Sequence, residues 1–519
     1  MNAPWMKWLL LVAAILLLDV SLTFHNVWPT PAISWRGEGS IECAAAMLVL
    51  IAVSRTRQIS ARALRVVTAL WIVLVVGRYA DVTATALFGR EINLYWDLRF
   101  IPNVVSLLAK AAHSWLVLGV AVTLVAVVAL LYVLLRWALG RVATAAHDTR
   151  ERIALGVAAL MVIVPGVPVA RPVTLTYARQ VGVAVRAMTG RTVVPASPAM
   201  TSNLARVKGA DVYLIFLESY GAVTFDRPAF ATGLAQARAA FETAIHDTGR
   251  DVVSTFVESP TFGGNSWLAH ISLMSGVEVR DPDVNAMLMA QQRDTIGTSF
   301  KRQGYRTVAL MPGLWQAWPE GVFYKFDEIY GGERLDYQGP EFGWFDIPDE
   351  YALAKFDALE AGKTPRAPLF MFFPTISTHT PFRPTPPYQP DWTRVLTAQP
   401  FDQPDLDRAF DQQADWLDLG PSYVDAMAYT YATLSGYLRR NADRDVVLIL
   451  LGDHQPPALV SGEGAPWDVP VHVIASRARH DVLDELVAKG FRRGLTPARP
   501  DLSKMHALLP ILLRAFGTT

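Results

Sequence analysis

The chain has 519 residues, too many for one compact core, and 52% of them are hydrophobic. Its 47 basic and 47 acidic side chains cancel, which argues against a nucleic-acid partner held by bulk charge. Cys43 is the only cysteine, so an intrachain disulfide is excluded, although this does not assign a compartment. The composition therefore indicates two or more domains, with part of the chain in a membrane.

Five apolar segments in the first third of the chain predict membrane-spanning helices. They cover about 5–24, 41–54, 66–88, 114–135 and 153–170, and a span needs about 20 apolar residues. The second is short and needs Gly37 to Ser40 to extend it. The first has a long apolar stretch with no small-x-small cleavage site after it, so we interpret it as a retained anchor. We expect a transmembrane domain of five helices over residues 1–170.

The arginines predict how these segments cross the membrane. With Lys7 on the cytoplasmic side, five spans place the loops at 54–65 and 136–152 in the cytoplasm, and these loops hold Arg55, Arg57, Arg62, Arg65, Arg136, Arg141, Arg150 and Arg152. Loops rich in arginine and lysine stay in the cytoplasm. Everything after residue 171 is then expected outside the cytoplasm, on the periplasmic side of an inner (plasma) membrane.

Residues 171–208 are predicted to connect the membrane domain to the rest of the chain. Apolar residues are spaced between Arg179, Arg186 and Arg191, which is typical of a helix that lies on the membrane surface. The segment from Pro195 to Pro198 ends that pattern. We expect an interfacial helix followed by a linker.

From residue 209 the chain alternates buried strands with helical stretches, which indicates an α/β domain over 209–519. The predicted strands are 212–217, 251–257, 369–373, 446–451 and 469–475. The run at 446–451 is apolar without interruption, as expected of a strand inside a parallel sheet. We interpret His472, inside the last strand, as structural.

Polar side chains follow several of these strands at once. Glu218 comes after the first, His379 stands in the loop after 369–373, and Asp453 and His454 follow Gly452. In open α/β sheets, ligands bind beyond the carboxyl ends of the strands. Gly452 would let the backbone twist so that both neighbours face one ion. Taken singly, each residue also has an interpretation without function: an acid often ends a buried strand, and a loop histidine is often only a surface residue.

The strand at 251–257 leads into a glycine turn and a predicted helix. After Gly263 and Gly264, either Asn265 or Ser266 can cap that helix. A hydroxyl at a helix N-terminus also lies where a phosphoryl group binds well. His270 lies one turn along, on the face of Ser266. A plain serine cap is the alternative interpretation.

Together these segments resemble the alkaline phosphatase–sulfatase superfamily, and most of all its lipoteichoic acid synthase and phosphoglycerol transferase branch. The motifs, in chain order, are Leu217-Glu218-Ser219, Gly264-Asn265-Ser266, Trp344-Phe345-Asp346, Thr378-His379-Thr380-Pro381-Phe382 and Gly452-Asp453-His454. The resemblance implies a sulfatase-like three-layer sandwich as the catalytic domain. It also implies that Glu218, Ser266, Asp453 and His454 bind one divalent cation, Mn²⁺ or Zn²⁺, with Mg²⁺ as the alternative. Ser266 would be the nucleophile, and His379 would bind the phosphoryl group or protonate the leaving oxygen.

The chain departs from the family in ways that bear on the substrate. Sulfatases carry Cys (or Ser)-x-Pro-x-Arg, but Leu268 and His270 stand at the Pro and Arg positions, which argues against formylglycine and sulfate-ester hydrolysis. The branch usually has threonine where Ser266 stands. Trp318-Pro319-Glu320 replaces a Trp-x-Arg that binds glycerol phosphate, so a phosphoethanolamine donor is an alternative to phosphoglycerol. His270, Trp318, Glu320 and His379 are expected to contact the substrate.

The resemblance implies an enzyme that transfers a phospho-headgroup from a membrane phospholipid to a glycan or lipid hydroxyl through a phosphoserine. If water replaces the acceptor, the same site makes a membrane-bound phosphodiesterase. A non-catalytic membrane protein that reuses the fold is a third reading, against which the four retained residues argue. The sequence leaves open the headgroup, the acceptor, the metal, a second metal and the oligomeric state.

Overall fold

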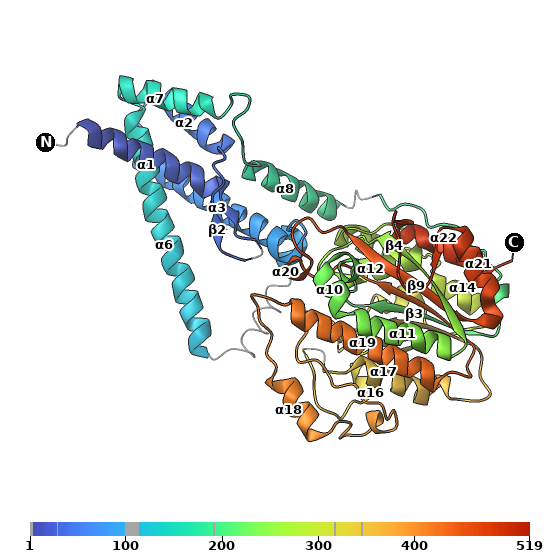
Figure 1. Cartoon of the computed structure of the whole chain (residues 1–519). Helices are drawn as coiled ribbons and strands as arrows, with labels where there is room; N and C mark the ends of the chain where they lie inside the picture. The colour runs from blue at the N-terminus through green and yellow to red at the C-terminus, as the bar shows by residue number, and fades with distance from the viewer. Residues whose placement is uncertain are drawn as a thin grey trace. The chain divides into compact units, whose positions relative to one another are not determined.

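The computed structural model describes residues 4–28, 30–98, 114–189, 193–315, 318–343 and 346–518. The chain divides into two compact units (Figure 1). One contains Met1–Leu87 and Glu91–Arg191, and the other contains Phe88–Arg90 and Thr192–Thr519. Trp344 and Phe345, which belong to one of the family motifs, lie outside the described residues.

The N-terminal unit is helical. Its elements are α1 (Pro4–Thr23), the strand pair β1 (His25–Asn26) and β2 (Ile33–Ser34), α2 (Ile41–Ser54), α3 (Ala61–Phe88), α4 (Leu94–Asp97), α6 (Ser114–Ala145), α7 (Thr149–Met161) and α8 (Val173–Thr189). Within the described ranges, three stretches are long and apolar enough to cross a membrane: Trp5–Thr23, Ala61–Leu87 and Leu118–Ala145. With 14 and 13 residues, α2 and α7 are shorter, about 20 Å each at 1.5 Å per residue. Helix length therefore supports three of the five expected spans.

Hydrogen bonds show which helix ends lie together in this unit. The Ser54 hydroxyl at the end of α2 donates to the Ala146 carbonyl just after α6, at 3.0 Å. The Arg141 guanidinium, near the end of α6, donates to the Lys7 carbonyl near the start of α1, at 2.7 Å. The loops that carry the arginines therefore lie at the same end of the bundle as Lys7.

The opposite ends of the same helices are joined as well. The Ser40 amide, which precedes α2, donates to the Asp19 carboxylate near the end of α1, at 2.8 Å. The Thr174 amide at the start of α8 donates to Glu42 in the first turn of α2, at 2.9 Å. Although α2 is short, it extends between the two ends of α1.

Helix α8 has one polar and one apolar face. On the polar face, the Gln180 side chain donates to the Ile92 carbonyl at 2.7 Å, and the Tyr177 hydroxyl donates to the Val73 carbonyl at 2.7 Å. Exposed apolar residues lie at helical spacing at Val181, Val185 and Met188, with a further one at Leu175. The expected amphipathic helix at 171–191 is thus present over Val173–Thr189.

The C-terminal unit is built on a nine-stranded sheet with the order β10-β4-β9-β8-β3-β7-β5-β6, with β11 beside β4. The strands are β3 (Asp211–Leu217), β4 (Arg250–Glu258), β5 (Arg306–Met311), β6 (Glu328–Gly331), β7 (Leu369–Pro374), β8 (Val446–Gly452), β9 (Asp468–Ser476), β10 (Arg492–Arg493) and β11 (Ser503–Lys504). The five strands predicted from sequence are present; β5, β6, β10 and β11 were not predicted.

Helices cover both faces of this sheet (Figure 1). Alternate side chains of β3 point to opposite cores, with Leu214 in one and Ile215 in the other. The first core includes α12 (Ser266–Ser275), α14 (Ile296–Arg302), α21 (His480–Ala488) and α22 (Met505–Phe516). The second includes α11 (Ala235–Asp247), α17 (Asp349–Phe356) and α19 (Gly420–Arg440). Shorter helices are α9 (Val223–Asp226), α10 (Pro228–Gly233), α13 (Pro282–Met289), α15 (Gly321–Tyr324), α16 (Gly332–Leu335), α18 (Gln403–Asp411) and α20 (Ala458–Ser461). The expected α/β layering is therefore present.

The sheet is mixed, not wholly parallel. Strand β8 is buried along its length as expected, but it is parallel only to β3 and antiparallel to β9. Because β4 is also antiparallel to β9, it runs in the same direction as β8. Strands β3, β4, β7 and β8 consequently end at one edge of the sheet, and the residues that follow them meet there.

Gly452 is required for a different reason from the one the sequence suggested. It remains in β8, paired with Leu217, and it is absent from the described glycines with positive φ. A Cβ at this position would lie 1.8 Å from the Tyr220 carbonyl oxygen. The glycine therefore makes room for a neighbouring backbone and is not needed for a twist.

We expect Gly452→Ala to lower the free energy of unfolding by about 3 kcal/mol, because backbone must move to admit the methyl group. Gly297→Ala is the matched control, since the nearest neighbour of its Cβ would be the Thr295 hydroxyl oxygen, at 3.6 Å. Thermal unfolding of the full-length protein in detergent measures both. A wild-type melting temperature for Gly452→Ala would contradict the close approach.

Candidate active site

Four side chains predicted to share a cation meet at the carboxyl edge of the sheet. Glu218 follows β3, Asp453 and His454 follow β8, and Ser266 begins α12 after the loop from β4. One ligand atom from each of Glu218, Asp453 and His454 lies within 4.8 Å of the others. The Ser266 Oγ lies 2.9 Å from Glu218 Oε2 and 3.1 Å from His454 Nε2.

Backbone amides hold the Asp453 carboxylate, and a serine hydroxyl holds that of Glu218. Ser219 has φ 57, and this left-handed turn lets its amide donate to Asp453 Oδ1 at 2.9 Å. The His454 amide donates to the same oxygen at 2.7 Å. The Ser219 hydroxyl donates to Glu218 Oε1 at 3.0 Å. With Asp453 Oδ1 held in this way, Asp453 Oδ2 lies on the side of His454 Nε2, at 3.8 Å.

The His454 ring presents a lone pair to the site. Its Nδ1 lies 2.7 Å from the Gln455 carbonyl, which can only accept, so Nδ1 carries the proton in the neutral ring. Burial lowers the pKa of His454 and favours that neutral form. The Nε2 atom is therefore the acceptor that faces Ser266 and is suited to ligate a metal.

Ser266 is not a helix cap. Asn265 occupies the N-cap position of α12 with φ 59, and its side chain makes no capping bond. The preceding loop is held by the Thr261 hydroxyl, which donates to the Gly264 carbonyl at 2.6 Å, and by the Gly263 amide, which donates to the Gln455 carbonyl at 3.1 Å. The half-buried Ser266 hydroxyl thus points at Glu218 and His454, and neither residue acts as the expected cap.

The charges at this site suit a divalent cation. Burial opposes ionisation of Glu218, but hydrogen bonds, including the one from the Ser266 hydroxyl, favour its ionised form, and its pKa is lowered. Burial and the Glu218 charge raise the pKa of Asp453 well above its usual value. The Ser266 hydroxyl has one proton for two acceptors. A cation would pair with both carboxylates and with the imidazole lone pair, so this set of ligands fits Mn²⁺, Zn²⁺ or Mg²⁺.

The loop after β7 holds Glu218 from both sides, which the sequence did not indicate. The Glu218 amide donates to the Thr375 hydroxyl at 3.0 Å, and the Thr378 hydroxyl donates to the Glu218 carbonyl at 2.5 Å. The run Thr-Ile-Ser-Thr-His-Thr from Thr375 was the available signal, because its hydroxyls can bond neighbouring backbone. His379 is carried on this same loop.

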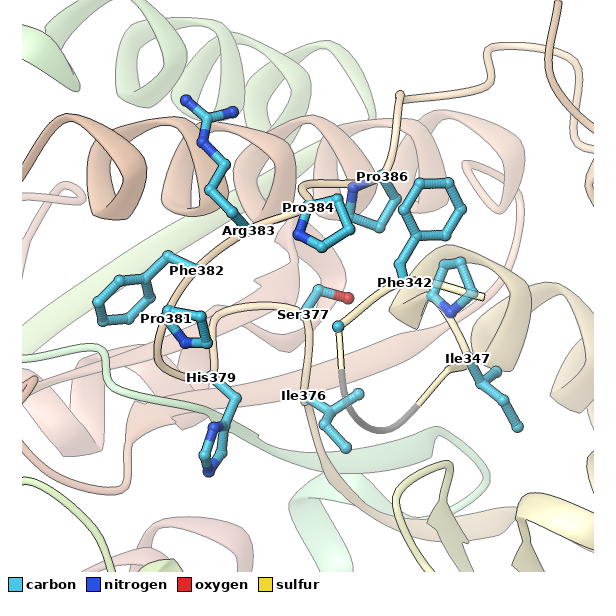
Figure 2. A pocket seen from close by; sticks show the side chains of 12 residues that line it. Phe342, Ile347, Ile376, Ser377, His379, Pro381, Phe382, Arg383, Pro384 and Pro386 are labelled. Atoms are coloured by element: carbon cyan, nitrogen blue, oxygen red, sulfur yellow. The ribbon is translucent and has the colours of Figure 1, made fainter. Parts of the chain in front are cut away.

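His379 stands beside a small hollow of about 30 Å³. The ring is half-buried, and its Nδ1 lies 2.9 Å from the Thr380 carbonyl. Figure 2 shows His379 at the edge of side chains that are mainly proline and aromatic: Phe342, Ile347, Pro381, Phe382, Pro384 and Pro386. Such a lining offers an apolar surface beside the site on which part of a substrate could pack.

His270 packs against core aromatic rings, and its predicted contact with the substrate stays a prediction. Its ring lies 4.5 Å from that of Phe216 and 5.4 Å from that of Phe372, measured between centroids. Burial lowers its pKa to about 3, so the ring is neutral. Ser266 and His270 do lie one turn apart on α12, but at His270 the helix is already packed into the core. His270 supports the helix from within.

The structure brings Trp318 and Glu320 to the same edge of the sheet, at a distance from the four. They follow β5, which is separated from β3 by β7, so the strand spacing alone is about 10 Å. The Trp318 ring stacks on Tyr324 at 5.3 Å, and Glu320 is exposed. Neither the stacking of Trp318 nor the exposure of Glu320 tests whether these residues bind the substrate.

His472 has the structural place expected of it. Its Nδ1 lies 2.7 Å from the Ser254 hydroxyl, and its Nε2 lies 2.9 Å from the Tyr220 hydroxyl. Because Ser254 donates to the Gly494 carbonyl at 2.7 Å, it accepts from Nδ1, and Nε2 accepts from Tyr220. Burial lowers the pKa of His472 to about 3. The ring is a neutral link between buried strands.

The sequence model of the sulfatase family matches residues 274–470. This stretch contains His379, Asp453 and His454 and begins after Glu218 and Ser266. No curated protein sequence matches the chain.

Several solved structures are distantly similar. Lipoteichoic acid synthase LtaP from Listeria monocytogenes shares 14% identity at a TM-score of 0.40, over 63% of this chain and 78% of that one. The lipooligosaccharide phosphoethanolamine transferase EptA from Neisseria meningitidis also shares 14% sequence identity at a TM-score of 0.40, over 90% of this chain and 89% of that one. The C-terminal periplasmic domain of EcEptC from Escherichia coli, in complex with Zn, shares 14% sequence identity at a TM-score of 0.39, over 61% of this chain and 84% of that one. These similarities are too distant to assign an activity.

Proposed function

We propose that this chain, whose residues 274–470 belong to a sulfatase-family domain, is a membrane-bound enzyme that transfers a phospho-headgroup from a phospholipid to a glycan or lipid hydroxyl. The observation that carries the proposal is the place of the Ser266 Oγ, 2.9 Å from Glu218 Oε2 and 3.1 Å from His454 Nε2. A hydroxyl held between a carboxylate and a neutral imidazole is suited to lose its proton and act as a nucleophile.

The residues of the site suggest a two-step course. Ser266 Oγ attacks the donor phosphorus, its proton passes to an adjacent acceptor, and the bond from phosphorus to the diacylglycerol oxygen breaks. His379 supplies a proton to that leaving oxygen, and the headgroup phosphate stays on Ser266. The acceptor hydroxyl then gives its proton to His379 and attacks the phosphoserine, the bond between Ser266 Oγ and phosphorus breaks, and Ser266 regains its proton from the group that had accepted it. A divalent cation held by Glu218, Ser266, Asp453 and His454 would lower the hydroxyl pKa and offset phosphoryl charge.

Sulfate-ester hydrolysis through formylglycine is disfavoured by the residues around Ser266. His270 stands where sulfatases have an arginine, and its buried ring has a pKa lowered to about 3 by burial. A neutral ring packed between Phe216 and Phe372 cannot supply the positive charge of a guanidinium at the mouth of the site.

The arrangement of the N-terminal helices supports a catalytic domain on the periplasmic side of an inner membrane. The loops bearing Arg55 to Arg65 and Arg136 to Arg152 lie at the Lys7 end of the bundle, joined to it through Ser54 and Arg141. If that end is cytoplasmic, α2 and α7 count as crossings despite their length, and the five helices alternate in direction. The chain after α7 then leaves on the opposite side. The exposed apolar stripe of α8 suits a helix that lies on that membrane surface.

The transferase and the hydrolase readings differ in where the headgroup ends. Membrane helices on the same chain favour transfer, since they keep the enzyme at its lipid donor. The test supplies phospholipid with a radiolabelled headgroup to membranes that contain the full-length protein. The proposal expects label on glycan or lipid together with stoichiometric diacylglycerol. Label released only as free headgroup phosphate would establish the phosphodiesterase instead.

We expect Glu320→Arg to shift donor preference from phosphatidylethanolamine towards phosphatidylglycerol by about fivefold, because an exposed carboxylate attracts the ammonium headgroup only modestly. Competition between the two lipids in mixed vesicles measures the ratio. The control for added charge is Glu333→Arg, because Glu333 is another exposed glutamate and lies on α16. Equal donor ratios for Glu320→Arg and wild type would exclude Glu320 from donor selection.

A further inference from the structure

Asp349 is a buried carboxylate outside the four metal-site residues. It begins α17 and is 2% exposed. Its Oδ1 accepts from the Ile376 amide and its Oδ2 from the Ser377 amide, both at 2.9 Å. The Asp349 amide in turn donates to the Ser377 hydroxyl at 3.1 Å. Three hydrogen bonds therefore join the start of α17 to the loop after β7.

The loop that Asp349 holds also carries functional groups. Its Thr375 and Thr378 hydroxyls bond the Glu218 backbone on either side. The His379 amide donates to the Ile376 carbonyl at 3.0 Å, so the turn that presents His379 starts at a residue bound to Asp349. A shift at Ile376 and Ser377 would therefore move His379 directly.

The contact requires an ionised carboxylate. Two neighbouring amides each need an acceptor, and a carboxylate offers two oxygens where an asparagine offers one, with its NH₂ facing the other amide. Burial raises the pKa of Asp349 to about 6, against the hydrogen bonds from this loop, which lower it. Burying an ionised carboxylate costs free energy, and the hydrogen bonds from the two amides explain why an acid is retained at this position.

We propose that Asp349 is a positioning residue for His379, which it holds in reach of the phosphoryl group through the backbone of Ile376 and Ser377. This inference rests on the proposed function, because it concerns a residue that acts on the leaving oxygen. It adds a residue of α17 that lies three positions after the Trp344-Phe345-Asp346 motif and that the sequence did not single out.

The test is a double-mutant cycle between Asp349→Asn and His379→Ala in the full-length protein. The activity of each variant is measured as its turnover of a chromogenic phosphodiester. Asp349→Asn is expected to lower kcat about 10- to 100-fold with little change in KM, because a small displacement of a positioned group has that effect. In the His379→Ala background, Asp349→Asn should lower kcat less than about twofold, since the side chain that Asp349 positions is no longer there. Bound metal should stay at the wild-type stoichiometry.

Asp357→Asn is the matched control. Asp357 is also buried, directly after α17, but it accepts from the Tyr437 hydroxyl at 2.9 Å and pairs with Arg444 at 3.0 Å. Arg444 also contacts Asp211 at the start of β3, the opposite end of the sheet from His379. Any effect of Asp357→Asn should therefore multiply with that of His379→Ala.

Ser377→Ala keeps the test decisive if Asp349→Asn fails to fold. It removes one of the three hydrogen bonds and should show a smaller effect on kcat that also disappears with His379→Ala. Equal fold-losses in the wild-type and His379→Ala backgrounds, or an unchanged kcat, would overturn the inference. A wild-type protein that does not turn over the phosphodiester would instead contradict the proposed function.

Discussion

Ser266→Ala is expected to lower headgroup transfer at least about a thousandfold, because it removes the protein atom proposed to form a bond to phosphorus. Glu218, Asp453 and His454 remain, so bound metal and the melting temperature should stay close to wild type. The measurement is diacylglycerol release from phospholipid vesicles by the full-length protein, with metal content determined on the same samples.

Ser219 provides a matched control for this substitution. Its hydroxyl also donates to Glu218, at 3.0 Å from Oε1, but Ser219 is 1% exposed and cannot meet a substrate. Ser219→Ala should therefore lower activity only modestly, through a less firmly held Glu218. A Ser266→Ala protein that keeps more than a tenth of wild-type activity would show that another group attacks the phosphorus.

Asp453→Asn is expected to lower metal affinity at least about a hundredfold and to abolish transfer, because a neutral amide replaces a charged ligand. The amide oxygen can still accept from the Ser219 and His454 amides, so the fold should be retained. Elemental analysis after dialysis against a chelator measures bound metal, and re-addition of Mn²⁺, Zn²⁺ or Mg²⁺ should restore wild-type activity but not that of the variant.

Asp211→Asn is the control for loss of a buried carboxylate. Asp211 begins β3, the strand that ends before Glu218, and it pairs with Arg366 at 2.6 Å. It should affect stability and leave metal content unchanged. If Asp453→Asn binds metal as wild type does, the cation is held elsewhere and the proposed site is wrong.

Much of the catalytic fold could be predicted because its central strands are buried on both faces. Strands β3, β7 and β8 are uninterrupted apolar runs, and each ends where a polar residue follows. Parallel strands that end at one edge then bring Glu218, His379 and Asp453 together, although they are far apart in sequence. Strand β5 begins with Arg306 and Thr307 and β6 has four residues, so neither has a comparable signal.

Features that depend on packing could not be predicted in this way. Helical spacing placed His270 on the face of Ser266, but it did not show that this face turns into the core one turn later. The role of Gly452 depends on the Tyr220 carbonyl, and the hydrogen bonds of Asp349 depend on a loop almost thirty positions away. Similarly, hydropathy showed that the segment at 41–54 is short, but it did not show that the helix predicted over 153–170 ends at Met161 and has only 13 residues.

The nucleophile can be tested most directly by mass spectrometry of the peptide that contains Ser266. The full-length protein is incubated with phosphatidylethanolamine and phosphatidylglycerol, quenched in acid and digested. The proposed course predicts that Ser266 carries phosphoethanolamine or phosphoglycerol in wild type, and that the adduct is absent from Ser266→Ala. Consumption of the donor at the wild-type rate while Ser266 stays unmodified throughout would contradict it.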